Sequence, residues 1–176
     1  THNLSNALAA ISVCDLLNVN HNSISSSFSK FEGINRRFDI HISNKKIVYI
    51  DDYAHHPEEI KSTISGIIDS FPERKLTVIF QPHLFSRTKD FAKEFAQSLS
   101  QADELILLDI YPAREEPIFG VDSKMLLDLC TNDSKIIFKN NELLSHLKDN
   151  KKDVVVTLGA GNISDLVKPI VSILDI

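Results

Sequence analysis

The stretch that decides the fold is DDYAHHPEE, residues 51–59, which follows an apolar run at residues 47–50. Pro57 suits the first turn of a helix because its missing N–H would have no intrahelical partner. Glu58 and Glu59 then favour the positive end of the helix dipole. We therefore expect residues 51–56 to connect a strand to a helix, with side chains pointing outward from the sheet edge. Ligands of open α/β sheets bind at this kind of edge.

Apolar residues after this stretch recur at helical spacing. Ile60, Ile64, Ile67 and Phe71 mark one stripe, and Pro72 ends it. Strands and helices then alternate to the end of the chain. The expected strands are residues 76–80, 104–109, 135–138 and 154–158, and the helices between them include residues 91–99, 125–129 and 142–147.

The later strands are nearly unbroken apolar runs, as in parallel strands covered on both faces. In contrast, Phe38, Ile40 and Ile42 alternate with polar residues and lead through a turn at residues 44–46 into residues 47–50, which indicates an antiparallel edge strand. The predicted fold class is α/β: a Rossmann-like, doubly wound, mostly parallel sheet with an antiparallel edge strand. Pro169 is expected to kink or restart the last helix.

Two helical stretches, residues 6–17 and 23–31, precede this region, and Gly33 is typical of the residue after a helix end. The first is apolar nearly all round. A helix with so little polar face needs covering on several sides, so we expect the chain to begin inside a larger protein.

Composition narrows the functional class. The chain has 176 residues, 43% hydrophobic and 24% charged, which fits one folded domain with a fragment of another. The formal net charge of −5 argues against a general nucleic-acid binder. No apolar run approaches the ~20 residues of a membrane span. Cys14 and Cys130 are expected to be buried and unpaired, as in a reducing, cytoplasmic compartment.

Four connections should meet at one edge of the sheet, because they all follow the carboxyl ends of parallel strands. They are residues 51–56, 81–88, 111–120 and 159–162. Their reactive side chains would become neighbours only in the folded sheet: Asp52, His55, His83, Arg87 and Arg114. An arginine can bind a carboxylate or phosphate with two hydrogen bonds, and a histidine can move a proton near neutral pH.

Each of these residues also has a purely structural interpretation. Arg87 could be a solvated helix-start residue, although a cation there opposes the helix dipole. Arg114 could belong to a surface salt-bridge cluster with Glu115 and Glu116. His83 could simply satisfy a turn. The Gly159-Ala160-Gly161 turn lacks the full dinucleotide fingerprint and is better explained as a tight strand-to-helix connection.

Taken together, the motifs resemble the Mur ligase family across essentially the whole chain. They are HNLSNALAA from residue 2, RRF at residues 36–38, DDYAHHP at residues 51–57, FQPHLFSRT at residues 80–88 and YPARE at residues 111–115. The last two favour the member that joins L-alanine to UDP-N-acetylmuramate in peptidoglycan precursor synthesis.

The resemblance implies a three-domain, amide-bond-forming ligase that uses ATP and Mg²⁺ and proceeds through an acyl phosphate. Residues 1–35 would be the last helices of a truncated central ATP-binding domain, and residues 36–176 the C-terminal domain. The partners would be the protein's own central and N-terminal domains, without nucleic acid or membrane. The sequence contains no P-loop pattern, so we expect this fragment alone to be inactive, with most Mg²⁺ ligands in the missing central domain.

The resemblance also assigns roles to residues. On the ATP side, Asn3 and Asn6 match positions at the adenine, Arg37 an arginine near the phosphates, and Asp52 an acid at the ribose. On the amino-acid side, the matching residues are Tyr53, His55, His83 and Arg87. His55 and Arg87 are the catalytic candidates: Arg87 would hold the alanine carboxylate, and a histidine would take a proton from the ammonium.

Three alternatives stay open. A recycling Mur ligase would attach a whole peptide to UDP-N-acetylmuramate. A receiver-type phosphoacceptor domain would use Asp51, Asp52 and Asp109 as an acidic pocket. A zinc hydrolase would use Asp52, His55, His56 and His83, although adjacent histidines rarely bind one metal ion.

Overall fold

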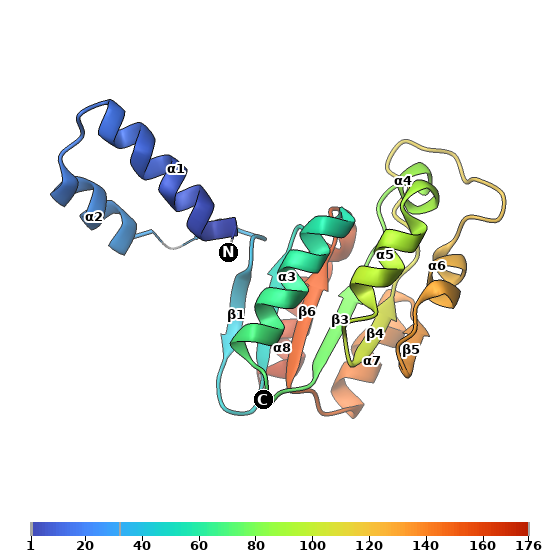
Figure 1. The fold of residues 1–176 in the computed structure, drawn as a ribbon. Helices are drawn as coiled ribbons and strands as arrows, with labels where there is room; N and C mark the ends of the chain where they lie inside the picture. The colour runs from blue at the N-terminus through green and yellow to red at the C-terminus, as the bar shows by residue number, and fades with distance from the viewer. Residues whose placement is uncertain (1, 32, 176) are drawn as a thin grey trace. The chain divides into compact units, whose positions relative to one another are not determined.

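The computed structural model describes residues 2–31 and 33–175, with side chains of the first helix described from residue 4. The chain divides into two compact units, Thr1–Ile34 and Asn35–Ile176. The first unit contains α1 (His2–Leu16) and α2 (His21–Ser29) (Figure 1). α2 starts earlier than predicted because the side chain of Asn20 accepts the N–H of Asn22 at 2.8 Å and caps the helix.

The second unit is built on a six-stranded sheet in the order β1-β2-β6-β3-β4-β5 (Figure 1). The strands are β1 (Asp39–Ser43), β2 (Val48–Asp52), β3 (Leu76–Phe80), β4 (Glu104–Leu107), β5 (Ser134–Ile137) and β6 (Val154–Leu158). β1 pairs with β2 antiparallel, and every other pairing is parallel. The predicted mostly parallel sheet with an antiparallel edge strand is confirmed.

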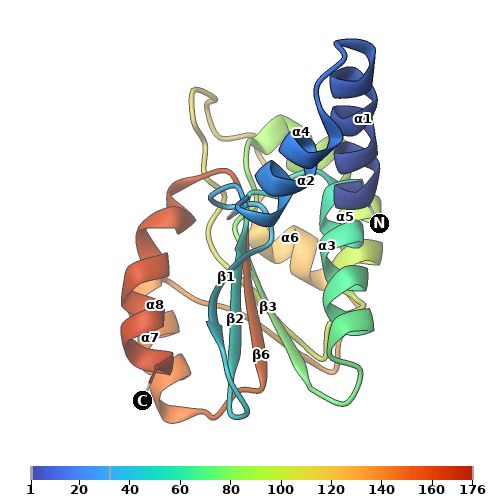
Figure 2. The same ribbon diagram turned by 90° about the vertical axis from the view of Figure 1, so that its left-hand side faces the viewer.

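Helices cover both faces of this sheet, as Figure 2 shows. α3 (Pro57–Ser70), α5 (Ala92–Leu99) and α6 (Ser123–Leu129) lie on one face, with α4 (Phe85–Asp90) leading into α5. α7 (Asn140–Asp149) and α8 (Val167–Leu174) lie on the other, with the 3-10 helix η1 (Asn162–Leu166) leading into α8. The last helix restarts at Val167, and Pro169 sits in its first turn, where a missing N–H breaks no helical bond.

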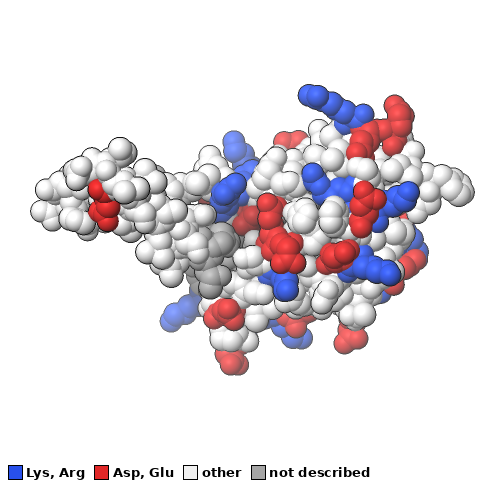
Figure 3. All heavy atoms as spheres, turned by 45° about the horizontal axis from the view of Figure 1, so that its top comes forward, with Lys and Arg blue, Asp and Glu red and all other residues white. Residues whose placement is uncertain are grey.

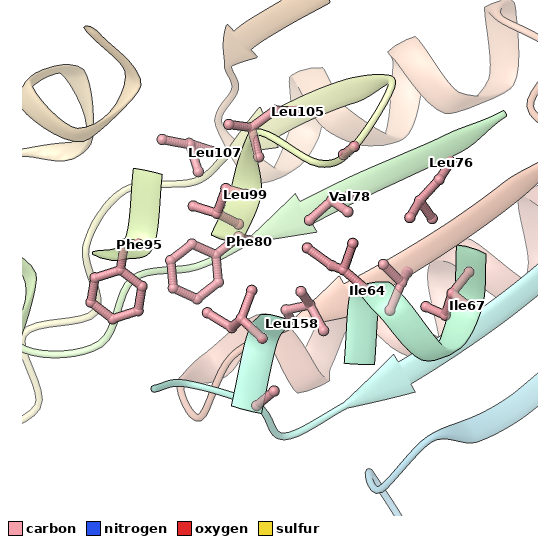
Figure 4. Close-up of a cluster of buried hydrophobic side chains, with 14 of the residues drawn as sticks. Ile64, Ile67, Leu76, Val78, Phe80, Phe95, Leu99, Leu105, Leu107 and Leu158 are labelled. Atoms are coloured by element: carbon pink, nitrogen blue, oxygen red, sulfur yellow. The ribbon is translucent and has the colours of Figure 1, made fainter. Parts of the chain in front are cut away.

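Two apolar clusters fill the space between the layers. Figure 4 shows the larger, in which Val78, Phe80 and Leu158 of the sheet pack against Ile64 of α3 and Phe95 of α5. The alternate strand residues form the second cluster with α7 and α8: Tyr49, Ile79, Ile106 and Val155. Both faces of each central strand are buried, which explains the unbroken apolar runs in the sequence.

The edge strand differs from the prediction in one respect. The expected alternation placed Phe38, Ile40 and Ile42 inward, but Ile40 is 49% exposed, while Ile42 is 6% exposed. A register irregularity between Ile40 and Ile42 turns the outer half of β1 away from the core. Phe38 itself lies before the strand, with a left-handed φ of 52°.

The two cysteines differ in burial. Cys130 is buried, but Cys14 is only half-buried, which corrects the expectation for that residue; both are free thiols. No helix in the described part of the chain is long and apolar enough to cross a membrane. Figure 3 shows acidic and basic side chains intermixed over the sheet unit, without a single-sign field on this face.

Candidate functional site

The carboxyl ends of β2, β6, β3 and β4 lie next to one another, so the connections that follow them share one edge of the sheet. His83 and Tyr111, on two of these connections, form an isolated parallel bridge. The turn after β6 is equally close, because a Cβ placed on Gly161 would come within 2.7 Å of Tyr111. The predicted convergence of distant loops therefore occurs in the structure.

The prediction that Asp51 and Asp52 lie in the connection after the strand, with outward side chains, is wrong. They are the last residues of β2, paired with Thr157 and Leu158 of β6, and they are 0% and 7% exposed. The strand continues through them because each charge finds donors inside the protein. Asp51 accepts hydrogen bonds from Arg36 Nε at 2.8 Å and from Thr157 Oγ1 at 2.7 Å.

The carboxylate of Asp52 is satisfied by its own surroundings. One oxygen accepts the N–H of Ala54 at 2.8 Å, and the other accepts the N–H of Phe38 at 2.9 Å and the hydroxyl of Thr63 at 3.3 Å. Burial raises the pKa of Asp52, although the amides of Ala54 and Phe38 act in the opposite direction. Asp52 thus links the segment before β1 and the middle of α3 to the end of β2.

Four rings form a row along the edge. Tyr53 meets His55 edge to face with ring centroids 5.1 Å apart, and His55 meets His83 at 6.1 Å. His83 then stacks on Tyr111 at 5.6 Å. The Nδ1 of His55 lies 3.0 Å from the carbonyl oxygen of Tyr53, so in the neutral tautomer with a proton on Nδ1 the free nitrogen would be Nε2.

Arg87 joins this row from the first turn of α4. The sequence placed it in a polar turn, but the helix already begins at Phe85, because Leu84 adopts a left-handed φ of 73° and donates its N–H to the carbonyl of Tyr111 at 2.9 Å. Arg87 therefore lies one helical turn after His83, with its Nη1 3.5 Å from the Nδ1 of His83. Burial lowers the pKa of His83, and the charges of Arg87 and His55 add to that effect.

Glu115 is a site residue that the sequence reading treated only as a surface alternative. Its carboxylate accepts the N–H of Ser86 at 2.9 Å and also the hydroxyl of Ser86. These bonds lower the pKa of Glu115 and tie the loop after β4 to the start of α4. An acidic side chain commonly accepts hydrogen bonds from a serine at a helix start, so the two residue types could have indicated this contact. Glu115 and Ser86 lie 29 residues apart, however, so no local pattern connects them.

The remaining candidates behave differently. Arg114 is exposed on the same loop, next to Ala113 with its left-handed φ of 52°, and does not join the ring row through any contact in the described part. Arg37 is exposed as well. Asn6 is exposed on α1, in the other unit, and the side chain of Asn3 lies outside the described residues.

A pocket of about 490 Å³ adjoins the row, and Tyr111 belongs to both. Residues from the ends of β3, β4, β5 and β6 line it: Gln81, Asp109, Ile110, Tyr111, Pro112, Phe138, Lys139, Asn140 and Asn162. Gln81 is held there by Asn162 at 2.8 Å and by the N–H of Ile163 at 2.9 Å. Among the described residues, no group of three or more His, Cys, Asp or Glu is arranged to hold a metal ion, so the zinc-hydrolase alternative has no support.

Known proteins share both the sequence and the fold. The UDP-N-acetylmuramate–L-alanine ligase of Flavobacterium psychrophilum is 49% identical over 174 residues, which are 99% of this chain and 39% of that protein. The corresponding ligase of Cytophaga hutchinsonii is 46% identical over 96% of this chain and 36% of its own length. The chain therefore spans about two fifths of the length of the curated relatives it matches.

Solved structures agree. The crystal structure of the UDP-N-acetylmuramate-alanine ligase from Thermotoga maritima matches 97% of this chain and 37% of its own with a TM-score of 0.77 at 30% identity. A murein peptide ligase from Psychrobacter arcticus matches 98% of this chain and 37% of its own with a TM-score of 0.69 at 25% identity. These likenesses leave the receiver-domain alternative without support. A family model for the Mur ligase glutamate ligase domain matches residues 36–161, and the chain accordingly belongs to the Mur ligase family.

Proposed function

We propose that the chain is the C-terminal portion of an ATP-dependent ligase that joins L-alanine to UDP-N-acetylmuramate. The observation that carries the proposal is the convergence of Tyr53, His55, His83 and Arg87 on one sheet edge. The relatives with similar sequences are named as ligases of this kind. The whole protein would be cytoplasmic and would bring its own central and N-terminal domains to this edge.

The amino-acid side of the reaction fits the geometry of Arg87 and the histidines. A guanidinium can hold an amino-acid carboxylate through two parallel hydrogen bonds. Arg87 is half-buried and forms no ion pair with the described residues, although its guanidinium lies 3.5 Å from His83 and its charge acts on Glu115. The lowered pKa of His83 favours its neutral form, which can accept a proton from the ammonium of alanine. His55, whose ring lies 6.1 Å from that of His83, is the second candidate for this role. A free amine is required, because only its lone pair can attack an activated carboxyl group.

The nucleotide side rests on two exposed residues whose side chains form no hydrogen bond or ion pair with the described part of the chain. ATP, when bound, supplies the phosphoryl group that activates the muramate carboxylate as an acyl phosphate. We assign Asn6 and Arg37 to the nucleotide, because both are exposed and their amide and guanidinium suit a base edge and a phosphate. Asp52 fits a ribose less well, since it is 7% exposed and both its oxygens already accept hydrogen bonds.

We further propose that residues 1–35 are the last helices of the central ATP-binding domain, with Asn3 at the adenine, and that most Mg²⁺ ligands lie in that domain. Two observations support this boundary. The compact units divide between residues 34 and 35, and the family model begins at residue 36.

Phosphate release by the whole protein would test the proposal. With ATP, Mg²⁺ and UDP-N-acetylmuramate, we expect L-alanine to be used at least roughly 100-fold better than a murein-type tripeptide with a free amino terminus, since a site must distinguish partners by specific contacts. The likeness to a murein peptide ligase makes peptide addition the second candidate. Preferential use of the tripeptide would establish that candidate. If neither L-alanine nor the tripeptide stimulates phosphate release, both candidate functions are wrong.

A further inference from the structure

We propose that Arg36 is a positioning residue that holds Tyr53 at the amino-acid site. The two adjacent arginines then have different roles: Arg36 is structural and Arg37 binds a ligand. The functional half of this inference rests on the proposed function. The structural half stands on the contacts of Arg36 alone.

The side chain of Arg36 connects the ends of two central strands. Its Nε donates to Asp51 of β2 at 2.8 Å, and its Nη2 donates to the carbonyl of Gly159, just after β6, at 2.7 Å. The side chain of Asp51 is 0% exposed and that of Arg36 is 22% exposed. Asp51 therefore depends on Arg36 for its compensating charge, because a buried carboxylate without a counter-charge is strongly unfavourable.

The backbone at Arg36 is held in a conformation that it would not adopt unaided. Arg36 has a φ of 60° and Phe38 a φ of 52°, in the left-handed region that side chains disfavour. Three bonds compensate: the N–H of Arg36 donates to Asp39 at 3.2 Å, its carbonyl accepts the N–H of Tyr53 at 2.6 Å, and the N–H of Phe38 donates to Asp52 at 2.9 Å. Such a conformation persists only where the surroundings fix it.

Tyr53 is the residue that these contacts place. Tyr53 is 43% exposed, so packing alone does not define the position of its ring. The guanidinium carbon of Arg36 lies 5.3 Å from the ring centroid, and the amide of Tyr53 is bonded to the carbonyl of Arg36. Since the ring of Tyr53 meets His55 at 5.1 Å, a displacement of Arg36 would be transmitted to the ring row.

Arg37 provides the matched contrast. It is the next residue in the chain and carries the same charge, but it is exposed and forms no ion pair or side-chain hydrogen bond with the described residues. The fold thus uses one of the two adjacent guanidinium groups and leaves the other available.

Amide hydrogen exchange on the whole protein, resolved to single residues by mass spectrometry, tests the structural half. Arg36→Lys removes one of the two side-chain hydrogen bonds and the guanidinium contact with the ring of Tyr53. We therefore expect the Tyr53 amide to exchange roughly tenfold faster or more, while β6 amides in the core keep their rates. Arg37→Lys should leave the Tyr53 amide within about twofold of the wild type. Asp51→Asn, which keeps the shape but removes the charge, should repeat the effect of Arg36→Lys. Equal Tyr53 exchange in all variants would overturn the proposal.

Kinetics of the whole ligase test the functional half. Arg36→Lys should raise the KM for alanine by about fivefold or more with the KM for ATP unchanged, and Arg37→Lys should do the reverse. If Arg36→Lys and Arg37→Lys each change the KM for alanine and the KM for ATP by the same factor, the two arginines do not have separate roles. If the wild-type whole protein does not ligate alanine, the proposed function fails, and the exchange experiment still decides the role of Arg36.

Discussion

The two edges of the sheet carry similar residue types but differ in how completely those residues are paired. At the amino edge, Glu104 accepts hydrogen bonds from Lys152 at 2.5 Å and Thr77 at 2.8 Å, and lies 3.3 Å from His146. The side chain of Lys152 is 8% exposed and that of Glu104 is 15% exposed. At the carboxyl edge, Arg87 and His83 are linked only by a 3.5 Å contact.

This difference separates a structural cluster from a binding site. Burial alone would raise the pKa of Glu104, but the bonds from Lys152 and Thr77 outweigh it and lower the pKa. The amino-edge charges therefore stabilise one another and leave little capacity for a ligand. At the carboxyl edge Arg36 has such a partner in Asp51, but Arg87 forms no ion pair within the described part of the chain. An incoming carboxylate can therefore pair with Arg87.

The largest effect is expected from Arg87→Met in the whole ligase. Removing the guanidinium should lower kcat/KM for alanine by roughly 1000-fold, because a bidentate charge-assisted contact to the carboxylate is lost. The free energy of unfolding should change by less than about 0.5 kcal/mol, since no buried partner is left behind. Lys89→Met, at an exposed cation on the same helix, is the control and should leave kcat/KM near the wild-type value.

Glu104→Gln should instead destabilise the fold, by about 2–3 kcal/mol in urea unfolding at pH 7, because it leaves the ammonium of Lys152 buried without its counter-charge. The contribution of Glu104 is present above its unfolded pKa near 4.5 and is lost as the pH falls through its lower folded pKa. The difference between variant and wild type should therefore shrink on acidification. Glu116→Gln, on an exposed loop, is the control; equal stabilities for Glu104→Gln and Glu116→Gln at pH 7 would contradict the prediction.

The smallest effect is a pH dependence of stability at His83. The folded pKa of His83 lies below its ordinary value of 6.5, so the unfolded chain binds the proton first as the pH falls. The wild type should lose stability between pH 6.5 and the lower folded pKa, and His83→Gln should lack that part of the loss. Chemical unfolding across this range measures it, with His21→Gln, whose side chain is 85% exposed, as the comparison. Identical pH profiles for wild type and His83→Gln would show that His83 does not titrate in this way.

Local sequence signals predicted much of the fold and the grouping of the site. The apolar stripe from Ile60 and the proline at residue 57 placed α3 to within a residue, because both features act over one or two helical turns. The carboxyl-end rule then predicted that the loops carrying His55, His83 and Arg87 would meet, and they do.

The errors arose where a distant partner decides the local structure. Ile40 alternates correctly in the sequence, but a register irregularity in the pairing with β2 exposes it. Asp51 and Asp52 are typical of a polar turn, and nothing near them indicates that Arg36, 15 residues away, and Thr157, 106 residues away from Asp51, would keep them inside a strand. The same limit hid Glu115, whose partner lies 29 residues earlier.

The sequence by itself determined the α/β class, the order of strands and helices and the edge on which the reactive side chains gather, because these depend on short-range periodicity and on the shared direction of parallel strands. Only the tertiary structure decided which charged side chains form ion pairs within the fold and which remain available for a ligand. Arg36 and Arg37 are adjacent and chemically identical, yet one pairs with a buried carboxylate and the other is exposed. That distinction depends on burial and on partners brought together from far along the chain, which no local pattern encodes.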